Sequence, residues 1–199
     1  MELNFSKYQG TGNDFVMIDN RIGIFNHNDL ELIARLCDRK FGIGSDGLIL
    51  IEDHSEYDFE MIYINPDGSK SLSGNGSRCA VMFAHNLNMI EFETNFLTIE
   101  GPLHAIIEND LVHLRMPDVT NMIHTEKKDL FLNTGSPHYV QFVAEVDTLD
   151  VVSEGRKIRY NDRFREKGTN VNFIQSTSEG IKIATYERGV EDETLACGT

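Results

Sequence analysis

Two short segments carry the side chains best suited to moving a proton. Ser73 precedes Gly74-Asn75-Gly76, and Cys197 precedes Gly198-Thr199, so each small polar side chain stands where a glycine-containing helix could begin. A thiol at a helix N-terminus has a lowered pKa, because the helix dipole and the unpaired N–H groups favour the thiolate. Such a thiolate can remove a proton or attack an electrophile.

Both residues also have structural interpretations. A lone cysteine is most often a buried apolar residue, but polar residues from Glu191 to Thr194 lead into Cys197, and a glycine follows it. A core cysteine rarely lies in such a turn. Ser73 is a preferred residue type for a helix N-cap, while the glycines after it could expose N–H groups to a carboxylate. For Ser73 the residues alone leave the structural and functional interpretations evenly balanced.

A weak internal repeat relates the two segments. Gly10-Thr11-Gly12-Asn13 leads into a strand, and Asn133-Thr134-Gly135-Ser136 does the same much later. From Gly12 to Ser73 is 61 positions, and from Gly135 to Cys197 is 62. The matched spacing predicts two copies of one unit that face each other across a site. The second copy stops directly after its key residue, so we expect roughly 50 residues to be absent from it, beginning with a helix after Cys197.

The sequence also predicts the strands and helices that would position these residues. Hydrophobic patterning predicts a mixed α and β protein, with a division near residues 117–129 into units 1–120 and 121–199. Helices are expected from an N-cap at Asn28 to Asp38, over Gly74–Leu87, and over Asp150–Arg159, the last interrupted by Gly155. Strands are expected at Leu3–Gln9, Phe15–Asp19, Gly47–Glu52, Phe59–Asn65, His104–Glu108, Leu111–Arg115, Phe131–Thr134, Tyr139–Val143, Val171–Ser176 and Ile181–Tyr186, with Asn109-Asp110 closing a hairpin.

Composition excludes several classes of protein. The 199 residues carry a net charge of −14, which argues against nucleic-acid binding. The three cysteines are odd in number and widely separated, and no ligand spacing for zinc is present. No apolar run could span a membrane, and the N-terminus lacks signal-peptide features, so we expect a cytoplasmic protein. An anionic substrate would be opposed by the overall charge and would need local donors such as helix N-termini.

At this point the chain resembles the diaminopimelate epimerases. Five segments look like the successive motifs of that family and follow its order along the whole chain: Gly10–Phe15, Asn65–Ser69, Gly74–Cys79, Gly168–Phe173, and Glu187-Arg188-Gly189 through Ala196-Cys197-Gly198-Thr199. The resemblance implies an α+β fold of two pseudo-symmetric domains, each a mostly antiparallel curved sheet around a central helix, with the second domain incomplete. It also implies an isomerase that interconverts LL- and meso-2,6-diaminopimelate, on the route to lysine and peptidoglycan, without pyridoxal phosphate or a metal. Family members are often homodimers.

The implied mechanism needs two groups on opposite faces of one carbon. Inverting the α-carbon requires a base on one face and an acid on the other, and one cysteine abstracts as thiolate while the other donates as thiol. The carbanion's charge spreads into the α-carboxylate, which N–H groups at the two helix starts would hold. Arg188 could pair with a carboxylate and Glu187 with an ammonium. By resemblance the catalytic positions are Ser73 and Cys197, and the substrate contacts are Asn13, Asn65, Gly74, Asn75, Asn170, Glu187, Arg188, Gly198 and Thr199.

The chain departs from the family pattern at Ser73, where the family has cysteine. Serine is a far weaker acid than cysteine, so it supplies almost no base at neutral pH, and we expect impaired proton transfer. Cys79 lies nearly two helical turns away and does not replace it. Ser136 stands where many relatives have Asn, and Gly47 where some have Gln, which weakens the inference of a substrate contact at each. His138 could line the site or be a packed strand residue, and we do not predict it to be catalytic.

Rival interpretations remain open. Proline racemases and phenazine-type isomerases share the expected fold, although the segment from Glu187 to Cys197 favours the epimerases. A protein of a different class, a non-catalytic module that keeps a diaminopimelate pocket but has lost one base, would also fit Ser73. Binding without exchange of the substrate's α-hydrogen would separate this module from an active isomerase.

Overall fold

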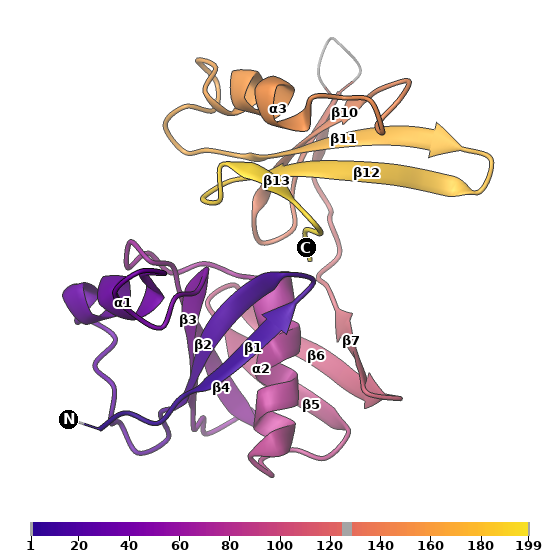
Figure 1. Ribbon diagram of the computed structural model, residues 1–199. Helices are drawn as coiled ribbons and strands as arrows, with labels where there is room; N and C mark the ends of the chain where they lie inside the picture. The colour runs from indigo at the N-terminus through magenta and orange to yellow at the C-terminus, as the bar shows by residue number, and fades with distance from the viewer. Residues whose placement is uncertain (1, 125–128, 199) are drawn as a thin grey trace. The chain divides into compact units, whose positions relative to one another are not determined.

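The computed structural model describes residues 2–124 and 129–198 and divides the chain into two compact units. Among the described residues, the first comprises those up to Met116 together with Gly198, and the second comprises those from Pro117 to Cys197. Each unit has a sheet of its own, as Figure 1 shows. We describe the two units separately.

In its described residues, the first unit contains a sheet with strand order β1-β2-β3-β4-β5-β6-β7. The β2–β3 and β4–β5 pairs are parallel and the other neighbours are antiparallel. The elements are β1 (Ser6–Gly10), β2 (Asn13–Asp19), α1 (Leu30–Cys37), β3 (Gly47–Glu52), β4 (Phe59–Ile64), α2 (Gly74–Asn86), β5 (Glu93–Thr98), β6 (Gly101–Glu108) and β7 (Leu111–Arg115).

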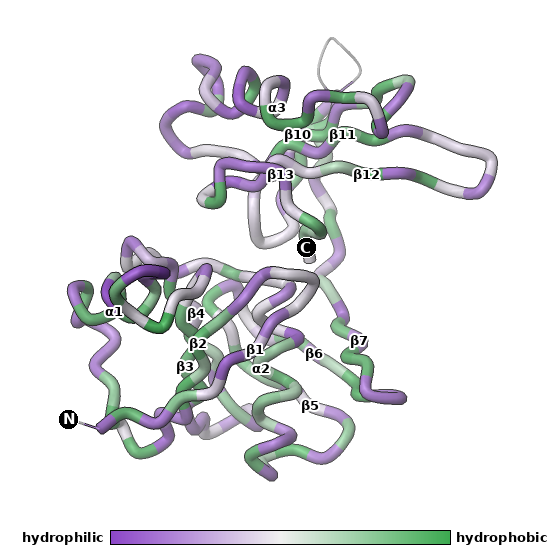
Figure 2. Tube along the Cα trace, in the orientation of Figure 1, coloured by the Kyte–Doolittle hydropathy of each residue, from purple (hydrophilic) through white to green (hydrophobic). Residues whose placement is uncertain are grey.

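A helix covers each face of this sheet. Strand side chains alternate between faces, so Phe15 and Met17 of β2 pack with α2, while Val16 and Ile18 pack with α1. Both faces of β2 and β3 are therefore buried in the middle of these strands, which is apolar in Figure 2. Because α2 contacts the edge strands β1 and β7 as well as the centre, the sheet curves around this helix.

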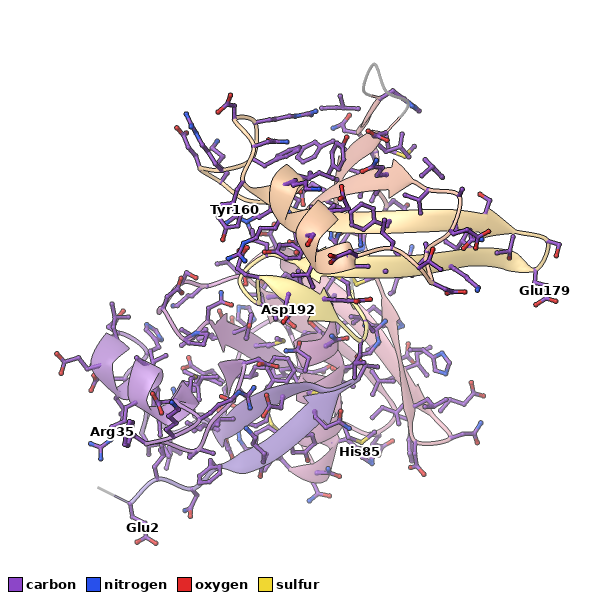
Figure 3. All side chains as sticks on the ribbon, turned by 45° about the horizontal axis from the view of Figure 1, so that its top comes forward. Glu2, Arg35, His85, Tyr160, Glu179 and Asp192 are labelled. Carbon is purple, nitrogen blue, oxygen red and sulfur yellow. The ribbon has the colours of Figure 1, made fainter. Side chains whose placement is uncertain are left out.

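In its described residues, the second unit contains a sheet with strand order β13-β12-β11-β10-β9-β8, in which only the β10–β11 pair is parallel. Helix α3 packs on one face through a cluster that includes Val151, Val171 and Tyr186. Glu179 lies in the turn between β11 and β12, and Asp192 lies in β13 (Figure 3). The elements are β8 (Met122–His124), β9 (Leu130–Asn133), β10 (Pro137–Phe142), α3 (Val151–Arg159), β11 (Asn170–Thr177), β12 (Gly180–Glu187) and β13 (Asp192–Thr194).

The two units repeat one topology, as the matched spacing predicts. The order β1-β2-α1-β3-β4 of the first recurs as β9-β10-α3-β11-β12 in the second, with the same sequence of antiparallel, parallel and antiparallel pairings. The parallel register begins at Phe15 opposite Gly47 in the first unit and at His138 opposite Asn170 in the second. Gly47 and Asn170 are therefore equivalent positions.

The structure corrects two expected helix features. The N-cap of α1 is Asp29, whose carboxylate accepts from the N–H of Leu32, and not Asn28. Gly155 does not interrupt α3. A Cβ at Gly155 would lie 2.4 Å from the Cβ of Tyr186, so the glycine lets the helix approach β12 closely. The hairpin turn at Asn109-Asp110 is confirmed, with φ angles of 52° and 62°.

Candidate functional site

Ser73 is the N-cap of α2. Its backbone is extended, with φ −125° and ψ 117°, and its Oγ accepts a hydrogen bond of 3.0 Å from the N–H of Gly76. The carbonyl of Ser73 accepts from the N–H of Ser77 at 2.8 Å. The side chain at position 73 therefore lies at the positive end of the helix, where a negative charge would be stabilised.

The first turn of α2 is buried. Gly74, Asn75, Gly76 and Ser77 are all buried, and Asn75 is 7% exposed. The N–H groups of the first helical turn have no intrahelical carbonyl to donate to. A Cβ at Gly76 would lie 2.9 Å from the Cδ1 of Ile49 and 3.1 Å from the Oγ of Ser73, so glycine lets the helix start approach β3. This turn is suited to binding a carboxylate.

The carboxamide of Asn13 is held by a carboxylate. Asn13 Nδ2 donates to Asp46 Oδ2 at 2.8 Å, and Arg39 donates to Asp46 Oδ1 at 2.6 Å. A carboxylate only accepts, so Nδ2 must face Asp46, and the Oδ1 of Asn13 then accepts from Asn75 Nδ2 at 3.5 Å. Burial alone would raise the pKa of the neighbouring Asp14, but Arg39 and Lys7 hold it well below the usual range.

Asn65 organises the loop that leads to α2. Its Nδ2 lies 3.1 Å from the carbonyl and the Oγ of Ser69 and 3.1 Å from the Oγ of Ser71, so its two hydrogens are shared among these three acceptors. Its Oδ1 accepts from the hydroxyl of Tyr63 at 2.9 Å. Both ends of the carboxamide therefore have partners within the first unit. Asn65 holds this loop whether or not it contacts substrate.

Cys197 lies in the second unit, after β13, and is partly exposed. The described residues end at Gly198, which groups with the first unit, so the predicted contact Thr199 and the helix expected to begin there lie outside them. Ser73, Asn13, Asn65, Gly74 and Asn75 belong to the first unit, whereas Cys197, Asn170, Glu187 and Arg188 belong to the second.

A buried chain of hydrogen bonds fixes Asn170. Asn172 Nδ2 donates to the Oγ1 of Thr185 at 2.7 Å, so Asn172 Oδ1 faces His138 Nδ1 at 2.8 Å. Because Oδ1 only accepts, Nδ1 of His138 carries the proton. The Nε2 of neutral His138 then accepts from Asn170 Nδ2 at 3.5 Å.

Asn170 connects this chain to Arg188. Its Nδ2 also donates to the Oγ of Ser136 at 2.9 Å, and its Oδ1 accepts the backbone N–H of Arg188 at 2.8 Å. The guanidinium of Arg188 donates to the carbonyl of Lys167 at 3.2 Å, and its aliphatic part lies against Gly168, whose φ is +74°. Glu187, the last residue of β12, is half-buried. The second unit therefore holds Asn170 and Arg188 together at the end of β12.

Sequence patterns did not identify Asp46, Asn172 or Thr185 as residues that support this site. A usable signal was present for Asn172, because asparagine is disfavoured in strands and Asn172 lies within the apolar run of β11. For Asp46 the partner that matters, Asn13, is 33 positions away, and nothing local indicates it.

The three cysteines differ in environment. Cys37 and Cys79 are buried in separate hydrophobic clusters of the first unit. Burial raises the pKa of the Cys79 thiol to about 11 and also raises the pKa of Cys37, although Ser45 partly offsets the latter shift. Cys79 is therefore a protonated core thiol at neutral pH and cannot act as a base in place of a residue at position 73.

We expect iodoacetamide to alkylate Cys197 and to leave Cys79 and Cys37 unmodified in the native protein. Only Cys197 among the three is partly exposed, and at pH 8 the buried thiol of Cys79 is almost wholly protonated. Peptide mass mapping after timed alkylation measures this order, with the protein in guanidinium chloride as the control in which all three react. Modification of Cys79 before Cys197 in the native protein would contradict it.

A second expectation concerns His138, which is 4% exposed. Burial is the largest cause of its lowered pKa, the charge of Arg188 lowers it further, and the hydrogen bond to Asn172 partly opposes both. The unfolded chain binds a proton near pH 6.5 while the folded chain does not. Stability is therefore complete above about pH 6.5 and falls as the pH drops towards the folded-state pKa, by at most about 1.4 kcal/mol per pH unit.

Urea unfolding between pH 5 and 8 measures this slope. The variant His138→Gln should flatten the pH dependence, whereas His124→Gln, which changes an exposed histidine in β8, should leave it as in the parent protein. An unchanged slope in His138→Gln would show that this histidine is not the group responsible.

Within the described residues, no group of three or more His, Cys, Asp or Glu side chains could hold a metal ion. None of the described helices has the length and hydrophobicity that crossing a membrane requires.

Several solved structures have the same fold as this chain. A phenazine biosynthesis protein from Bacillus anthracis superposes with a TM-score of 0.69 at 13% identity, covering 100% of this chain and 77% of that one. A hydroxyproline epimerase from Agrobacterium vitis superposes with a TM-score of 0.66 at 17% identity, covering 91% of this chain and 69% of that one. At these identities the likeness establishes the fold: two pseudo-symmetric α+β domains.

Sequence comparison identifies the family of this chain among the proteins that share the fold. The chain is 54% identical over 200 residues to a diaminopimelate epimerase of Flavobacterium psychrophilum and 40% identical over 218 residues to that of Aquifex aeolicus. In both comparisons the alignment covers 99% of this chain and 78% of the relative. The model of the diaminopimelate epimerase family matches residues 5–120 and 130–199. With the ordered motifs and the repeated units, these matches show that the chain belongs to the diaminopimelate epimerase family.

Proposed function

We propose that this protein binds 2,6-diaminopimelate and interconverts its LL and meso forms by cofactor-independent two-base proton transfer, and that Ser73 impairs this transfer. The observation that carries the proposal is the equivalence of Ser73 and Cys197. Ser73 follows β4, the fourth strand of one copy, and Cys197 follows β12, the fourth strand of the other, and the short strand β13; Ser73 also caps a buried helix start. The family's curated relatives are named for the same reaction.

In this reaction the group on one face of the α-carbon takes the α-hydrogen as a proton. The electron pair of the broken C–H bond moves into the α-carboxylate, and the group on the opposite face gives a proton to the carbon. The N–H groups of Gly74 and Asn75 and those at Gly198 and Thr199 would stabilise the carboxylate as its charge increases. Cys197 supplies one of the two groups, and the residue at position 73 supplies the other.

Ser73 limits the second group. A cysteine thiol has a pKa of about 8.5 in the absence of neighbours, which a helix N-terminus lowers further. A serine hydroxyl is a far weaker acid and supplies almost no alkoxide. Its Oγ already accepts the N–H of Gly76, as an N-cap does. Ser73 therefore suits helix capping better than proton abstraction.

The side chains of Asn13, Asn65, Asn170, Glu187 and Arg188 are proposed to hold the two amino-acid ends of the substrate. Asn13 presents its carbonyl oxygen because Asp46 holds its amino group, so it is suited to accept from an ammonium. Arg188 would pair with a carboxylate and Glu187 with an ammonium. We also propose a cytoplasmic location, as the sequence features lead us to expect, and a homodimer, as the family resemblance implies.

Calorimetry and hydrogen exchange together test the proposal. Titration with meso-diaminopimelate measures binding, and incorporation of solvent deuterium at the α-carbon measures proton abstraction. We expect binding together with slow exchange. Rapid exchange by the parent protein would refute the impairment by Ser73, and the absence of both binding and exchange would refute the substrate assignment.

A non-catalytic binding module is the second candidate, and the serine at position 73 favours it. Such a module would bind diaminopimelate with the same affinity but show no exchange above the rate of a Cys197→Ala variant. Comparing the parent protein with Cys197→Ala therefore separates a slow enzyme from a module.

A further inference from the structure

The ring of Tyr63 lies across Gly47. Tyr63 is in β4 and Gly47 begins β3, and the two strands pair with Leu48 opposite Ile64. A Cβ at Gly47 would lie 2.4 Å from Cε2 and 3.0 Å from Cζ of the Tyr63 ring. Any side chain at position 47 would have to move the tyrosine.

The ring of Phe15 also contacts the ring of Tyr63. Phe15 is fully buried and lies opposite Gly47 in the parallel register of β2 and β3. Its ring meets that of Tyr63 edge-on, with centroids 5.8 Å apart and planes at 85°. The tyrosine is therefore held in one orientation over the glycine.

This orientation brings the hydroxyl of Tyr63 to Asn65. The hydroxyl donates to Asn65 Oδ1 at 2.9 Å, which leaves Nδ2 to donate to Ser69 and Ser71. The backbone N–H of Asn65 also donates to the carbonyl of Ser69 at 2.8 Å. Ser71 is two residues before Ser73. The hydrogen bond from Tyr63 therefore links the sheet to the loop 65–72 that ends at the N-cap, in addition to the bridge between Ile64 and Lys70 and the packing of Leu72 in the core.

The second unit is built differently at the equivalent positions. Asn170 corresponds to Gly47, and His138 corresponds to Phe15. There a carboxamide extends from the strand itself, and the buried side chain of His138 and the backbone N–H of Arg188 fix it. In the first unit the strand has no side chain at this position, and an aromatic ring from the neighbouring strand fills the space.

From these observations we propose that Tyr63 is a positioning residue of the first half-site: lying over Gly47, it fixes Asn65 and the loop 65–72 and so sets the place of residue 73 at the start of α2. The expected effect of Tyr63 on turnover rests on the proposed function. The expected effect of Tyr63 on the position of residue 73 does not depend on diaminopimelate.

The test uses the variant Ser73→Cys, because a thiol reports its own environment. The rate of alkylation of the introduced thiol as a function of pH gives its apparent pKa. The parent protein, which retains Cys37, Cys79 and Cys197, is the blank. Into this background are introduced Tyr63→Phe, which removes only the hydroxyl, and Tyr8→Phe as the matched control. Tyr8 has a similar edge contact with Phe83, at 5.5 Å, and its hydroxyl bonds Asn86 near the C-terminal end of α2.

We expect Tyr63→Phe to raise the apparent pKa of the introduced thiol, because a looser loop carries it away from the helix N-terminus. We also expect kcat to fall about tenfold with a smaller change in KM, as for a misplaced catalytic group. Tyr8→Phe should change neither quantity. Melting curves of both variants would show that each remains folded.

Gly47→Ala gives an independent check. If alanine acts by displacing the tyrosine, it should shift the thiol pKa in the same direction, and adding Tyr63→Phe to Gly47→Ala should have little further effect. The proposal would be overturned if the effects of Gly47→Ala and Tyr63→Phe on the thiol pKa were additive. It would also be overturned if Tyr63→Phe and Tyr8→Phe gave the introduced thiol the same pKa. If no variant turns over diaminopimelate but the pKa shifts are seen, the proposed function fails while the positioning role stands.

Discussion

Replacing Ser73 with cysteine is expected to raise the rate of α-hydrogen exchange from diaminopimelate by roughly 10²- to 10⁴-fold, the usual contribution of a positioned general acid or base. The backbone around position 73 already suits a thiolate. The residue is the N-cap of α2, its side chain faces the N–H of Gly76, and the first helical turn is buried. The substitution changes one atom and leaves these groups in place.

The measurement is deuterium incorporation at the α-carbon from each stereoisomer, followed by mass spectrometry. Ser73→Ala is the matched control, because it removes the hydroxyl without adding a thiol, and we expect it to be as slow as the parent protein. If Ser73→Cys exchanges no faster than Ser73→Ala, residue 73 is not one of the two proton-transfer groups.

Removing Cys197 from the Ser73→Cys protein is expected to abolish the gain. Two-base inversion needs a group on each face of the carbon, so Cys197→Ser should lower the rate by a similar roughly 10²- to 10⁴-fold. Substrate affinity measured by calorimetry should change little, since Asn170 and Arg188 are held by their own contacts within the second unit.

The double variant Ser73→Cys/Cys197→Ser exchanges the two residue types between the half-sites. We expect it to be about as slow as the parent protein, because it again has one thiol and one hydroxyl. The gain from Ser73→Cys and the loss from Cys197→Ser therefore cancel, and the rate returns to that of the parent protein. A double variant that retained the full rate of Ser73→Cys would show that Cys197 takes no part.

The repeated topology was predictable because its signals are local. Glycine-containing turns and apolar strand runs mark the same order of elements twice, and the spacing from Gly12 to Ser73 matches that from Gly135 to Cys197. Strand β5 was missed for an equally physical reason. Its buried side chains include Thr94 and Thr98, and threonine is a residue type that is usually exposed. The burial of Thr94 is compensated by a hydrogen bond that its hydroxyl donates to Asp58. The two three-residue strands, β8 and β13, are too short to show a period.

The candidate site residues were named by resemblance to a family, but the side chains that hold them were not. Asp46 orients Asn13 across 33 positions of sequence, and His138 reaches Asn172 across 34. Such contacts depend on which strands become neighbours. The ring of Tyr63 over Gly47 is of the same kind, because a glycine at the start of a strand predicts nothing about what covers it.

The capping hydrogen bond of Ser73 also affects stability. A serine oxygen is a good acceptor for the N–H of Gly76, whereas a protonated thiol is a weak one, and loss of an N-cap costs about 1 kcal/mol. Ser73→Cys should therefore lower the free energy of unfolding by roughly that amount, as a urea titration beside Ser73→Ala would show, while it raises the exchange rate. We therefore expect a screen for heat resistance and a screen for turnover to select opposite residues at position 73, serine in the first and cysteine in the second.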